Sequence, residues 1–338
     1  MDTQNPLFSI CIPAFNCANY IDRAISSVLN QAFSSWELII VDDCSSDNLE
    51  GALARLSLNW EKVKLIHLGR NCGPFCARRK AFEASSGRYI ICLDADDCLN
   101  ADALSKIYSV IKDYSSDVIL FNMVSDLNSA SCLIDYGRSG LMPGKQNSKT
   151  LIEVFGSSYS LNNLASKAIK RELLLPISPC PYHRLKMCED RLEVLGVFQK
   201  MKTPYLLDEG LYVYYMNPNS TTNSKFEVEF CFQQSYVESL VNDYLLALDI
   251  CPDSQYKLFI DLWISDFIKL AVSLNFHDLV SAITKLASDS FFVQSSGHID
   301  KNLLRLDKRI IFWLLNHGYF GLCARLLQFL CSAKSLFS

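Results

Sequence analysis

Short apolar segments alternate with amphipathic ones through the first 125 residues of the chain. Five apolar runs have the length and hydrophobicity of buried strands: Ser9–Ile12, Trp36–Val41, Val63–Ile66, Tyr89–Leu93 and Val118–Phe121. Between them, helical spacing of apolar residues predicts helices over residues 20–29, 74–84 and 101–111. Near-continuous apolar strands that alternate with helices form a mainly parallel central sheet flanked by helices. The pattern therefore predicts an α/β, Rossmann-like fold.

The pattern changes twice further along the chain. Residues 126–224 combine a Gly-, Ser- and Asn-rich region, short helices with a proline-rich turn over 157–200, and an aromatic-rich extended segment, Tyr205–Tyr215. From Phe226 onward the apolar spacing is helical to the end. We therefore predict three parts, residues 1–125, 126–224 and 225–338, of which the last is an all-helical extension.

Composition and charge narrow the class of protein. Half of the 338 residues are hydrophobic and 20% are charged, which is typical of a globular protein with a sizeable core. The formal net charge is −4 and no basic block occurs, which disfavours a nucleic-acid-binding role. The 14 cysteines include no Cys-x-x-Cys pair and many lie in apolar runs, so we expect reduced thiols. No charged segment followed by an apolar core opens the chain, so a cytoplasmic location is expected.

Three carboxylates follow the fourth predicted strand: Asp94, Asp96 and Asp97. Ligands of parallel sheets bind beyond the carboxyl ends of the strands. Carboxylates this close together repel one another unless a cation lies among them, and oxygen ligands suit Mg²⁺ or Mn²⁺. The alternative is a solvated acidic turn, or an N-cap formed by Asp97 for the following helix. The residues alone leave both interpretations open.

Two acidic pairs add to this picture. Asp42 and Asp43 end the second predicted strand, where a carboxylate either accepts hydrogen bonds from a nucleotide or caps a turn. Glu189 and Asp190 either open a helix, where the helix dipole favours acids, or present a general base to a substrate. The sequence does not choose between these alternatives.

Taken together, these segments resemble family 2 glycosyltransferases. Five segments between Phe8 and Asn100 match the donor-binding half of that family in order and spacing, and a fainter likeness continues to residue 215. The matching segments are Ser9–Asn16, Ala24–Gln31, Trp36–Asp47, Asn71–Gly73 with Ala77 and Arg78, and Gly87–Asp97, followed by Asn163–Leu173 and the Glu189–Asp190 pair. The resemblance implies a GT-A fold, with residues 1–125 as the donor-binding half and 126–224 as the acceptor-side half.

The resemblance also implies donor-binding roles. Asp43 would hydrogen-bond the nucleobase in a pocket lined by Pro13 and Phe15. The further residues that would bind the donor are Asp42, Arg78, Asp94 and Ala95.

The metal and catalytic roles follow from the same resemblance. Asp96, with Asp94 beside the ribose, would ligate Mn²⁺ or Mg²⁺, and the metal would bridge the diphosphate. Asp190 would take the proton from the acceptor hydroxyl, and Glu189 would support it or touch the acceptor. The family inverts the configuration at the anomeric carbon in one displacement.

The chain departs from the family pattern at several positions. Arg79 stands where the family often has Asn, and Ser166 precedes Lys167 where Asn is usual. Tyr212–Tyr215 lacks the Arg often found there; it would either stack on an acceptor sugar or form an ordinary buried strand. His183 is the histidine nearest the presumed site, and Asn219–Thr221 matches a glycosylation triplet; both are more typical of plain surface loops.

The C-terminal helices allow two interpretations. Residues 309–337 are strongly apolar, but no uninterrupted apolar run reaches the roughly 18 residues of a spanning helix. The helices would either close a core or a dimer contact, or lie on an anionic membrane surface through Lys308, Arg309, Arg325 and Lys334.

The expected function is that of an inverting, metal-dependent glycosyltransferase. UDP is the nucleotide expected from family frequency, and the acceptor would be a glycan or lipid-linked glycan in bacterial surface polysaccharide or lipopolysaccharide synthesis, at the inner face of the cell membrane. The alternative is a non-catalytic nucleotide-sugar-binding or scaffold subunit, which would be expected to lose Asp96 or Asp190. A nucleotidyltransferase would have a Gly-rich loop after the first strand, whereas Pro13–Asn16 contains no glycine. The donor sugar, linkage and oligomeric state are not specified by the sequence.

Overall fold

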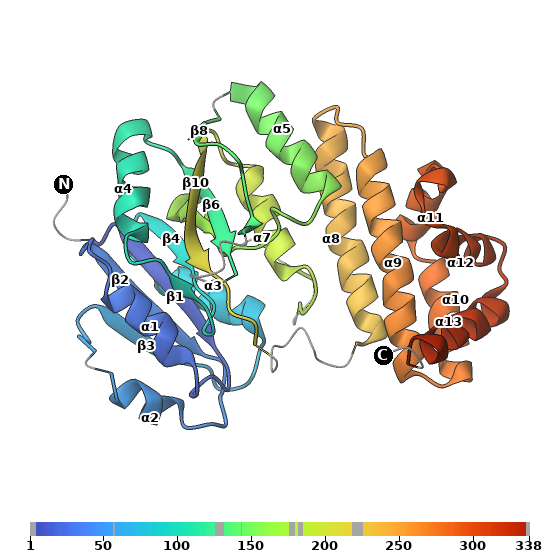
Figure 1. Cartoon of the computed structure of the whole chain (residues 1–338), viewed down its shortest axis with the longest axis horizontal. Helices are drawn as coiled ribbons and strands as arrows, with labels where there is room; N and C mark the ends of the chain where they lie inside the picture. Colours follow the sequence, from blue (N-terminus) through green and yellow to red (C-terminus); the bar gives the residue numbers. More distant parts are fainter. Residues whose placement is uncertain are drawn as a thin grey trace. The chain divides into compact units, whose positions relative to one another are not determined.

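The computed structural model describes residues 5–56, 58–125, 132–142, 144–175, 180–181, 185–217 and 226–335. The chain divides into two compact units, one of residues 1–150 and 162–218, the other of residues 151–161 and 219–338. The first unit is a sheet flanked by helices and the second is helical (Figure 1). The predicted α/β class with a helical C-terminal part is confirmed. The assignment of donor and acceptor halves within the first unit stays a prediction.

Ten strands of the described chain form one sheet, in the order β3-β2-β1-β4-β9-β6-β10-β5, with β7 paired to β6 and β8 paired to β10. Their bounds are β1 Phe8–Ala14, β2 Trp36–Asp42, β3 Val63–His67, β4 Tyr89–Cys92, β5 Cys98–Leu99, β6 Val118–Val124, β7 Cys132–Ile134, β8 Gly140–Leu141, β9 Lys167–Lys170 and β10 Pro204–Val213. Strand β1 pairs in parallel with β2 and β4, β2 with β3, and β6 with β10. The mainly parallel sheet was predicted from the five apolar runs, which are β1 to β4 and β6.

Strand β9 lies antiparallel in the middle of this sheet. Ala168 is in register with Ile91 of β4 on one side and with Ile119 of β6 on the other. The prediction of short helices within residues 157–200 is wrong for residues 167–170, which form this strand. The strand has only four residues with a lysine at each end, so its apolar signal is two residues long.

Helices of the first unit are α1 Ile21–Leu29, α2 Leu49–Ala54, α3 Pro74–Ala84, α4 Ala103–Tyr114, α6 Arg171–Leu174 and α7 Glu189–Phe198, and α5 Gly144–Ser157 runs on into the second unit. Helix α3 has the predicted bounds. Helix α4 begins at Ala103 after an N-cap at Asp102, so the alternative in which Asp97 caps that helix is wrong.

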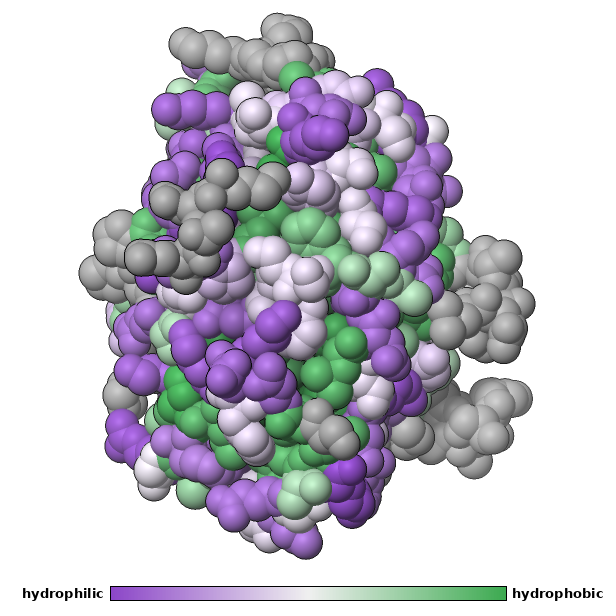
Figure 2. Space-filling model, turned by 90° about the vertical axis from the view of Figure 1, so that its left-hand side faces the viewer, coloured by the Kyte–Doolittle hydropathy of each residue, from purple (hydrophilic) through white to green (hydrophobic). Residues whose placement is uncertain are grey.

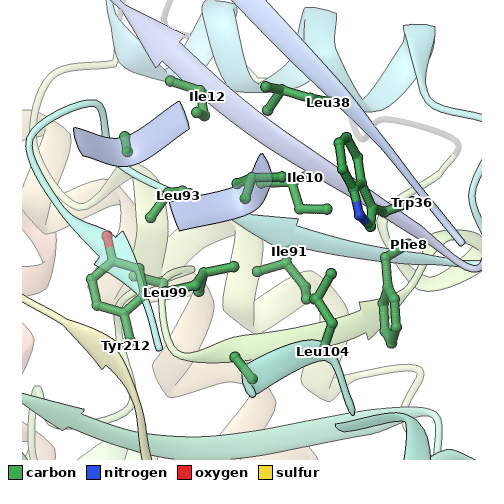
Figure 3. Packing of buried hydrophobic residues seen from close by; sticks show 14 of the residues in the cluster. Phe8, Ile10, Ile12, Trp36, Leu38, Ile91, Leu93, Leu99, Leu104 and Tyr212 are labelled. Atoms are coloured by element: carbon green, nitrogen blue, oxygen red, sulfur yellow. The ribbon is translucent and has the colours of Figure 1, made fainter. Parts of the chain in front are cut away.

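The core of the first unit lies against β1. Phe8, Ile10 and Ile12 alternate along this strand and are fully buried. Figure 3 shows them packed among side chains from neighbouring strands and α4, with Leu38, Ile91 and Leu104 in the same cluster. On the face drawn in Figure 2, polar side chains are interspersed with the apolar ones that remain exposed, which is ordinary for a protein surface. Because β1 is buried on both faces and lies between β2 and β4, the loops that follow these three strands begin from a rigid part of the sheet.

The second unit is built from α8 Val228–Ala247, α9 Asp253–Ser273, α10 Phe276–Ala287, α11 Ser290–His298, the short η2 Lys301–Leu303, α12 Leu306–Asn316 and α13 Phe320–Ser335. Its core centres on α9, where Trp263 is fully buried and stacks on Phe292 of α11. No helix within the described part of the chain is long and apolar enough to cross a membrane.

Candidate nucleotide-sugar site

The predicted acidic residues gather at one edge of the sheet. Ala14 at the end of β1 is in register with Asp42 at the end of β2, and Cys11 pairs with Cys92 of β4. The carboxyl ends of these three strands therefore meet, as expected for the ligand-binding edge of a parallel sheet. Asp43 follows β2 directly, and Asp94 and Asp96 follow β4.

Asp43 is buried and holds the start of α3. Its two carboxylate oxygens accept hydrogen bonds from the backbone N–H groups of Cys72 at 2.6 Å and Gly73 at 2.7 Å. Gly73 has φ +87° and precedes Pro74 at the first position of the helix. The carboxylate therefore binds N–H groups at a helix N-terminus, where the helix dipole also favours a negative charge. Its contact with a nucleobase stays a prediction.

Asp42 is held in a turn next to Asp43. Its side chain accepts from the backbone N–H of Ser45 at 3.0 Å and lies 3.0 Å from Nδ1 of His67 on β3. Burial opposes ionisation, but the hydrogen bonds from Ser45 and His67 outweigh it and lower the pKa of Asp42. Asn16 adopts φ +48° after β1, and its Oδ1 accepts from the N–H of Ser46. These bonds brace the loops on both sides of the strand ends.

The other predicted donor residues differ in their exposure. Phe15, directly after β1, is 42% exposed and presents its ring at the sheet edge. Pro13 is partly buried within β1, and Ala95 is buried. Of these three residues, Phe15 is the one with an accessible apolar face.

Arg78 joins three carboxylates that are far apart in sequence. The guanidinium group, on α3 and largely buried, donates to Asp190 at 2.6 Å and to Asp94 at 3.1 Å, and it lies 3.6 Å from Glu189. Burial alone would lower the pKa of Arg78, but the charges of Asp190, Asp94 and Glu189 raise it well above its usual value. The structure therefore brings the two sequence-predicted clusters, one after β4 and one on α7, into one site around a fixed positive charge.

Glu189 and Asp190 form the first turn of α7, as the helix-opening alternative predicts. Asp190 accepts from Arg78 with one oxygen and from the backbone N–H of Leu164, at 3.1 Å, with the other. Burial and the neighbouring Asp190 raise the pKa of Glu189, although Arg78 opposes the shift. The two adjacent acids thus have different surroundings: Arg78 is hydrogen-bonded to Asp190 at 2.6 Å and lies farther, at 3.6 Å, from Glu189.

The acidic cluster after β4 divides into two kinds of residue. Asp97 is buried and accepts hydrogen bonds from the Tyr212 hydroxyl at 2.6 Å and the N–H of Tyr215 at 2.9 Å. Burial, reinforced by Asp94, raises its pKa to about 7. Asp96 accepts from Asn217 at 2.9 Å, and Asp94 accepts from Arg78. Asp97 is therefore structural, whereas Asp94 and Asp96 are partly exposed, and their binding of a ligand stays a prediction.

No three potential metal-ligating side chains of the described chain lie close enough together to form a ready-made metal cluster. Asp94 and Asp96 nevertheless fit a hard divalent ion, because each places carboxylate oxygens at the strand ends. Mg²⁺ is usually held by one or two carboxylates together with substrate phosphates rather than by an all-protein cage. The donor set therefore suits a metal that arrives with a diphosphate.

Several residues of the site were not singled out by the sequence analysis. The Arg79 side chain binds Glu193 of α7 at 2.5 Å, the guanidinium of Arg23 lies 3.6 Å from the ring centre of Tyr215, and Lys167 is fully buried. Arg79 and Lys167 were noted there only as a departure from, or a match to, the family pattern. Glu193 and Tyr215, the partners of Arg79 and Arg23, are distant in sequence, so no local spacing identifies these two contacts.

The aromatic segment near the end of β10 is a buried strand in part. Tyr212 is fully buried, as the ordinary-strand alternative requires, and its ring packs in the core shown in Figure 3. Tyr214 is 37% exposed, and its stacking on an acceptor sugar stays a prediction. His183 and Asn219–Thr221 lie outside the described residues.

A mainly parallel sheet with carboxylates at its strand ends, joined through an arginine to an acidic pair on a following helix, agrees with the predicted GT-A fold. Residues 9–130 match the family model described as glycosyl transferase family 2. Residues 9–130 therefore carry a family 2 glycosyltransferase domain, which confirms the family resemblance over this part of the chain.

Curated relatives match the same part of the chain. The putative teichuronic acid biosynthesis glycosyltransferase TuaG of Bacillus subtilis is 40% identical over 106 residues, which are 31% of this chain and 42% of that protein. The UDP-Glc:alpha-D-GlcNAc-diphosphoundecaprenol beta-1,3-glucosyltransferase WfgD of Escherichia coli is 37% identical over 105 residues, 31% of this chain and 41% of that protein. The matched region thus spans about two fifths of these relatives.

The fold likeness extends further than the sequence likeness. The crystal structure of S. aureus TarS 1-349 in complex with UDP-GlcNAc matches 95% of this chain and 90% of its own, with a TM-score of 0.67 at 16% identity. At this identity the match shows a shared fold.

Proposed function

We propose that the protein is an inverting glycosyltransferase that moves a sugar from a nucleotide diphosphate sugar to a hydroxyl group of a glycan. The observation that carries this proposal is the contact of Arg78 with both Asp94 and Asp190. It brings the carboxylate that follows β4, on the donor side, next to a carboxylate suited to act as a base. A general base must lie within reach of the atom that it deprotonates, and the shared arginine supports this role by holding Asp190 close to Asp94.

The donor is a UDP-sugar in this proposal. Two relatives support it by their own ligands: the printed name of WfgD gives UDP-Glc as donor, and TarS was solved with UDP-GlcNAc. Phe15 and Pro13 line the base pocket, with Asp42, Asp43 and Ala95 around it. Because both Asp43 oxygens already bind N–H groups of the α3 start, a base N–H would use a second lone pair of the same carboxylate.

Asp94 and Asp96 hold Mn²⁺ or Mg²⁺ in this proposal, together with the donor diphosphate. The metal supplies charge neutralisation for the leaving nucleotide. Arg78 keeps Asp94 oriented towards the site, since its guanidinium is itself fixed by Asp190 and Glu189.

Asp190 takes the proton of the acceptor hydroxyl as the hydroxyl oxygen attacks the anomeric carbon. Its oxygens bind Arg78 and Leu164 with one lone pair each, which leaves lone pairs free for the incoming proton. Glu189 adds to the negative potential beside it, and attack opposite the leaving diphosphate inverts the anomeric carbon.

The acceptor belongs to bacterial surface polysaccharide or lipopolysaccharide synthesis, as a glycan or lipid-linked glycan. The printed names of the relatives support this assignment: TuaG is attributed to teichuronic acid biosynthesis, WcaA of Escherichia coli to colanic acid biosynthesis, and WfgD acts on a sugar linked to diphosphoundecaprenol. The protein would then work in the cytoplasm, at the inner face of the cell membrane.

Helix α12 supports contact with that membrane. Ile311, Phe312 and Leu315 of this helix are buried, yet Ile310 and Trp313 are about half exposed on the opposite side. Exposed apolar side chains that lie together on the outer side of a packed helix are typical of a surface that binds a partner or a membrane. Residues 299–335 also contain six basic and two acidic residues in a chain of net charge −4, which suits an anionic lipid surface.

Vesicle binding tests this membrane contact. We expect the parent to co-sediment with vesicles of phosphatidylglycerol and phosphatidylcholine more than with phosphatidylcholine alone. The double variant Ile310→Ser/Trp313→Ser should lose that binding, and Val293→Ser, an exposed residue of α11, should keep it. Equal vesicle binding by both variants would show that Ile310 and Trp313 do not contact the bilayer. A change of oligomeric state in the double variant without lipid would show that this face binds another protein chain instead.

Metal-dependent release of nucleotide tests the catalytic proposal. UDP-, GDP- and dTDP-sugars would be screened with Mn²⁺ and with octyl glycosides as acceptors, comparing the parent with Asp96→Ala and Asp190→Asn. We expect one donor to be turned over, with loss of release in Asp96→Ala and loss of transfer to the glycoside in Asp190→Asn. Asp113→Asn, an exposed carboxylate of α4, is the matched control. If folded parent neither binds a donor by calorimetry nor turns one over, the non-catalytic scaffold alternative replaces this function.

A further inference from the structure

Lys167 is a charged residue in the centre of the sheet. It opens β9, between β4 and β6, and its side chain is fully buried. An isolated buried ammonium is strongly unfavourable, so such a residue needs a specific environment. The hydrogen bonds of its Nζ within the described chain go to the backbone oxygen of Asn163 at 2.5 Å and to the Oδ1 of Asn163 at 3.2 Å.

The segment that Lys167 holds is the one that contacts Asp190. Asn163 is followed by Leu164, whose backbone N–H donates to Asp190 Oδ2 at 3.1 Å. Asn162, on its other side, accepts from Arg191 at 2.6 Å. Residues 162–164 are therefore tied to the first turn of α7 at two adjacent points.

The backbone of this segment is also constrained. Ser166 has φ +55°, a conformation that costs free energy for any residue with a Cβ. Its hydroxyl donates to the same Asn163 Oδ1 that Lys167 binds, at 3.1 Å. Asn163 Oδ1 thus accepts hydrogen bonds from both Ser166 and Lys167. The bond from Lys167 closes the strained turn between Asn163 and β9.

We propose that Lys167 is a positioning residue for the catalytic base: its ammonium fixes Asn163, so that the Leu164 N–H orients Asp190 opposite Arg78. The inference rests on the proposed function, because it assigns Lys167 a role in proton transfer by Asp190. Lys167 itself does not touch the substrate.

The electrostatic surroundings agree with this geometry. Burial lowers the pKa of Lys167 to about 7, and the charge of Asp190 opposes that shift, followed by Cys92 of β4. The other ionisable groups around Asp190 are Arg78 on α3, Asp94 after β4, and Glu189 and Glu193 on α7. At and below neutral pH the ammonium therefore adds positive charge on the β9 side of a site that is otherwise rich in carboxylates.

The test compares Lys167→Met, which keeps the length of the side chain, with Lys167→Arg, which keeps the charge. Lys170→Met, the same substitution three residues along β9 at a partly exposed position, is the matched control. Transfer would be measured across pH 5–9 with the donor and octyl glycoside found in the screen, or with water as acceptor if no glycoside serves. Donor affinity from calorimetry and unfolding by urea would be recorded for each variant.

We expect kcat of Lys167→Met to fall about 10- to 100-fold, the order caused by misplacing a catalytic group by about 1 Å, with donor affinity unchanged. The acid-side loss of activity should begin at a higher pH, because a carboxylate that has lost a neighbouring cation binds a proton more readily. Lys167→Arg should keep the acid-side pH profile of the parent, because both side chains are charged there.

Other results overturn the inference. If folded Lys167→Met has the kcat and the pH profile of Lys170→Met, or if it loses only stability, Lys167 has a purely structural role. An inactive parent would instead contradict the proposed function, so the two failures are distinguishable.

Discussion

At the scale of single residues, the site is organised by carboxylates that bind the protein itself. Asp43 is an example, since it accepts the N–H groups of Cys72 and Gly73 with separate oxygens. We expect Asp43→Asn to lower the free energy of unfolding by about 1–3 kcal/mol, because an amide has one acceptor oxygen for two buried donors. Urea unfolding measures this, and Asp113→Asn should change stability by less than about 0.5 kcal/mol. An Asp43→Asn variant as stable as the control would contradict the holding role.

Arg78 has the opposite role, as one cation among three carboxylates. Removing one partner of a buried ion pair costs about 3–5 kcal/mol. We expect Arg78→Met to be destabilised by that order at pH 8, measured by urea unfolding. Without the guanidinium, the pKa of Glu189 rises further above its ordinary value. The folded protein then binds a proton at Glu189 more tightly than the unfolded chain does. This difference stabilises the folded state at low pH, and the contribution is lost as pH rises.

The destabilisation of Arg78→Met should therefore be smaller at pH 5 than at pH 8. Arg55→Met, whose side chain is 63% exposed, serves as a control with little effect at either pH. A loss of stability that is independent of pH would mean that Arg78 acts through packing alone.

Lys167 makes a separate prediction for stability. Its pKa of about 7 in the folded protein lies below its ordinary value, so between these two pH values the unfolded chain binds more protons. This residue therefore makes the folded state more stable as pH rises from about 7 towards 10. In Lys167→Met, the free energy of unfolding should rise less over that range than in Lys170→Met. Equal slopes for the two variants would show that Lys167 is charged in the folded protein throughout.

At the scale of elements, α3 and α7 are connected by adjacent arginines. Arg78 binds Asp190, and Arg79 binds Glu193 one turn further along α7. Both members of the second pair are less than 15% exposed. A double-mutant cycle of Arg79→Met and Glu193→Gln should give a coupling free energy of about 0.5–3 kcal/mol, the range for residues in contact. Additive effects would show that the pair does not fix the two helices.

The sequence predicts the elements whose signal is local. The runs that became β1, β2, β4 and β6 are mostly apolar, and α3 begins after Gly73 with Pro74, so each could be located from its own residues. Strand β9 could not, because its identity comes from two neighbouring strands and not from its four residues. The same holds for Arg78: its position was matched, but its partner Asp190 lies 112 residues away.

At the scale of the molecule, sequence likeness and fold likeness have different extents. The family match ends at residue 130, whereas the fold of TarS matches 95% of the chain. The strand-end loops within residues 9–130 thus match the family in sequence. The similarity to TarS extends over nearly the whole chain, but in fold and with only 16% sequence identity. The helical pattern from Phe226 onward was enough to predict that unit as all-helical, because packing faces depend on hydrophobic spacing and not on particular residues.

The central position of β9 also bears on how the protein emerges from the ribosome. When residue 125 has been synthesised, all five matched donor segments exist, but β4 has no neighbour beyond β1 and its four residues are entirely buried in the finished sheet. An unpaired apolar edge invites pairing with another chain. A fragment of residues 1–125 should therefore aggregate where residues 1–218 remain soluble, as sedimentation after expression would show. Residues 1–125 would likewise not be exchangeable as a self-contained unit, because the strand that closes this sheet is translated later.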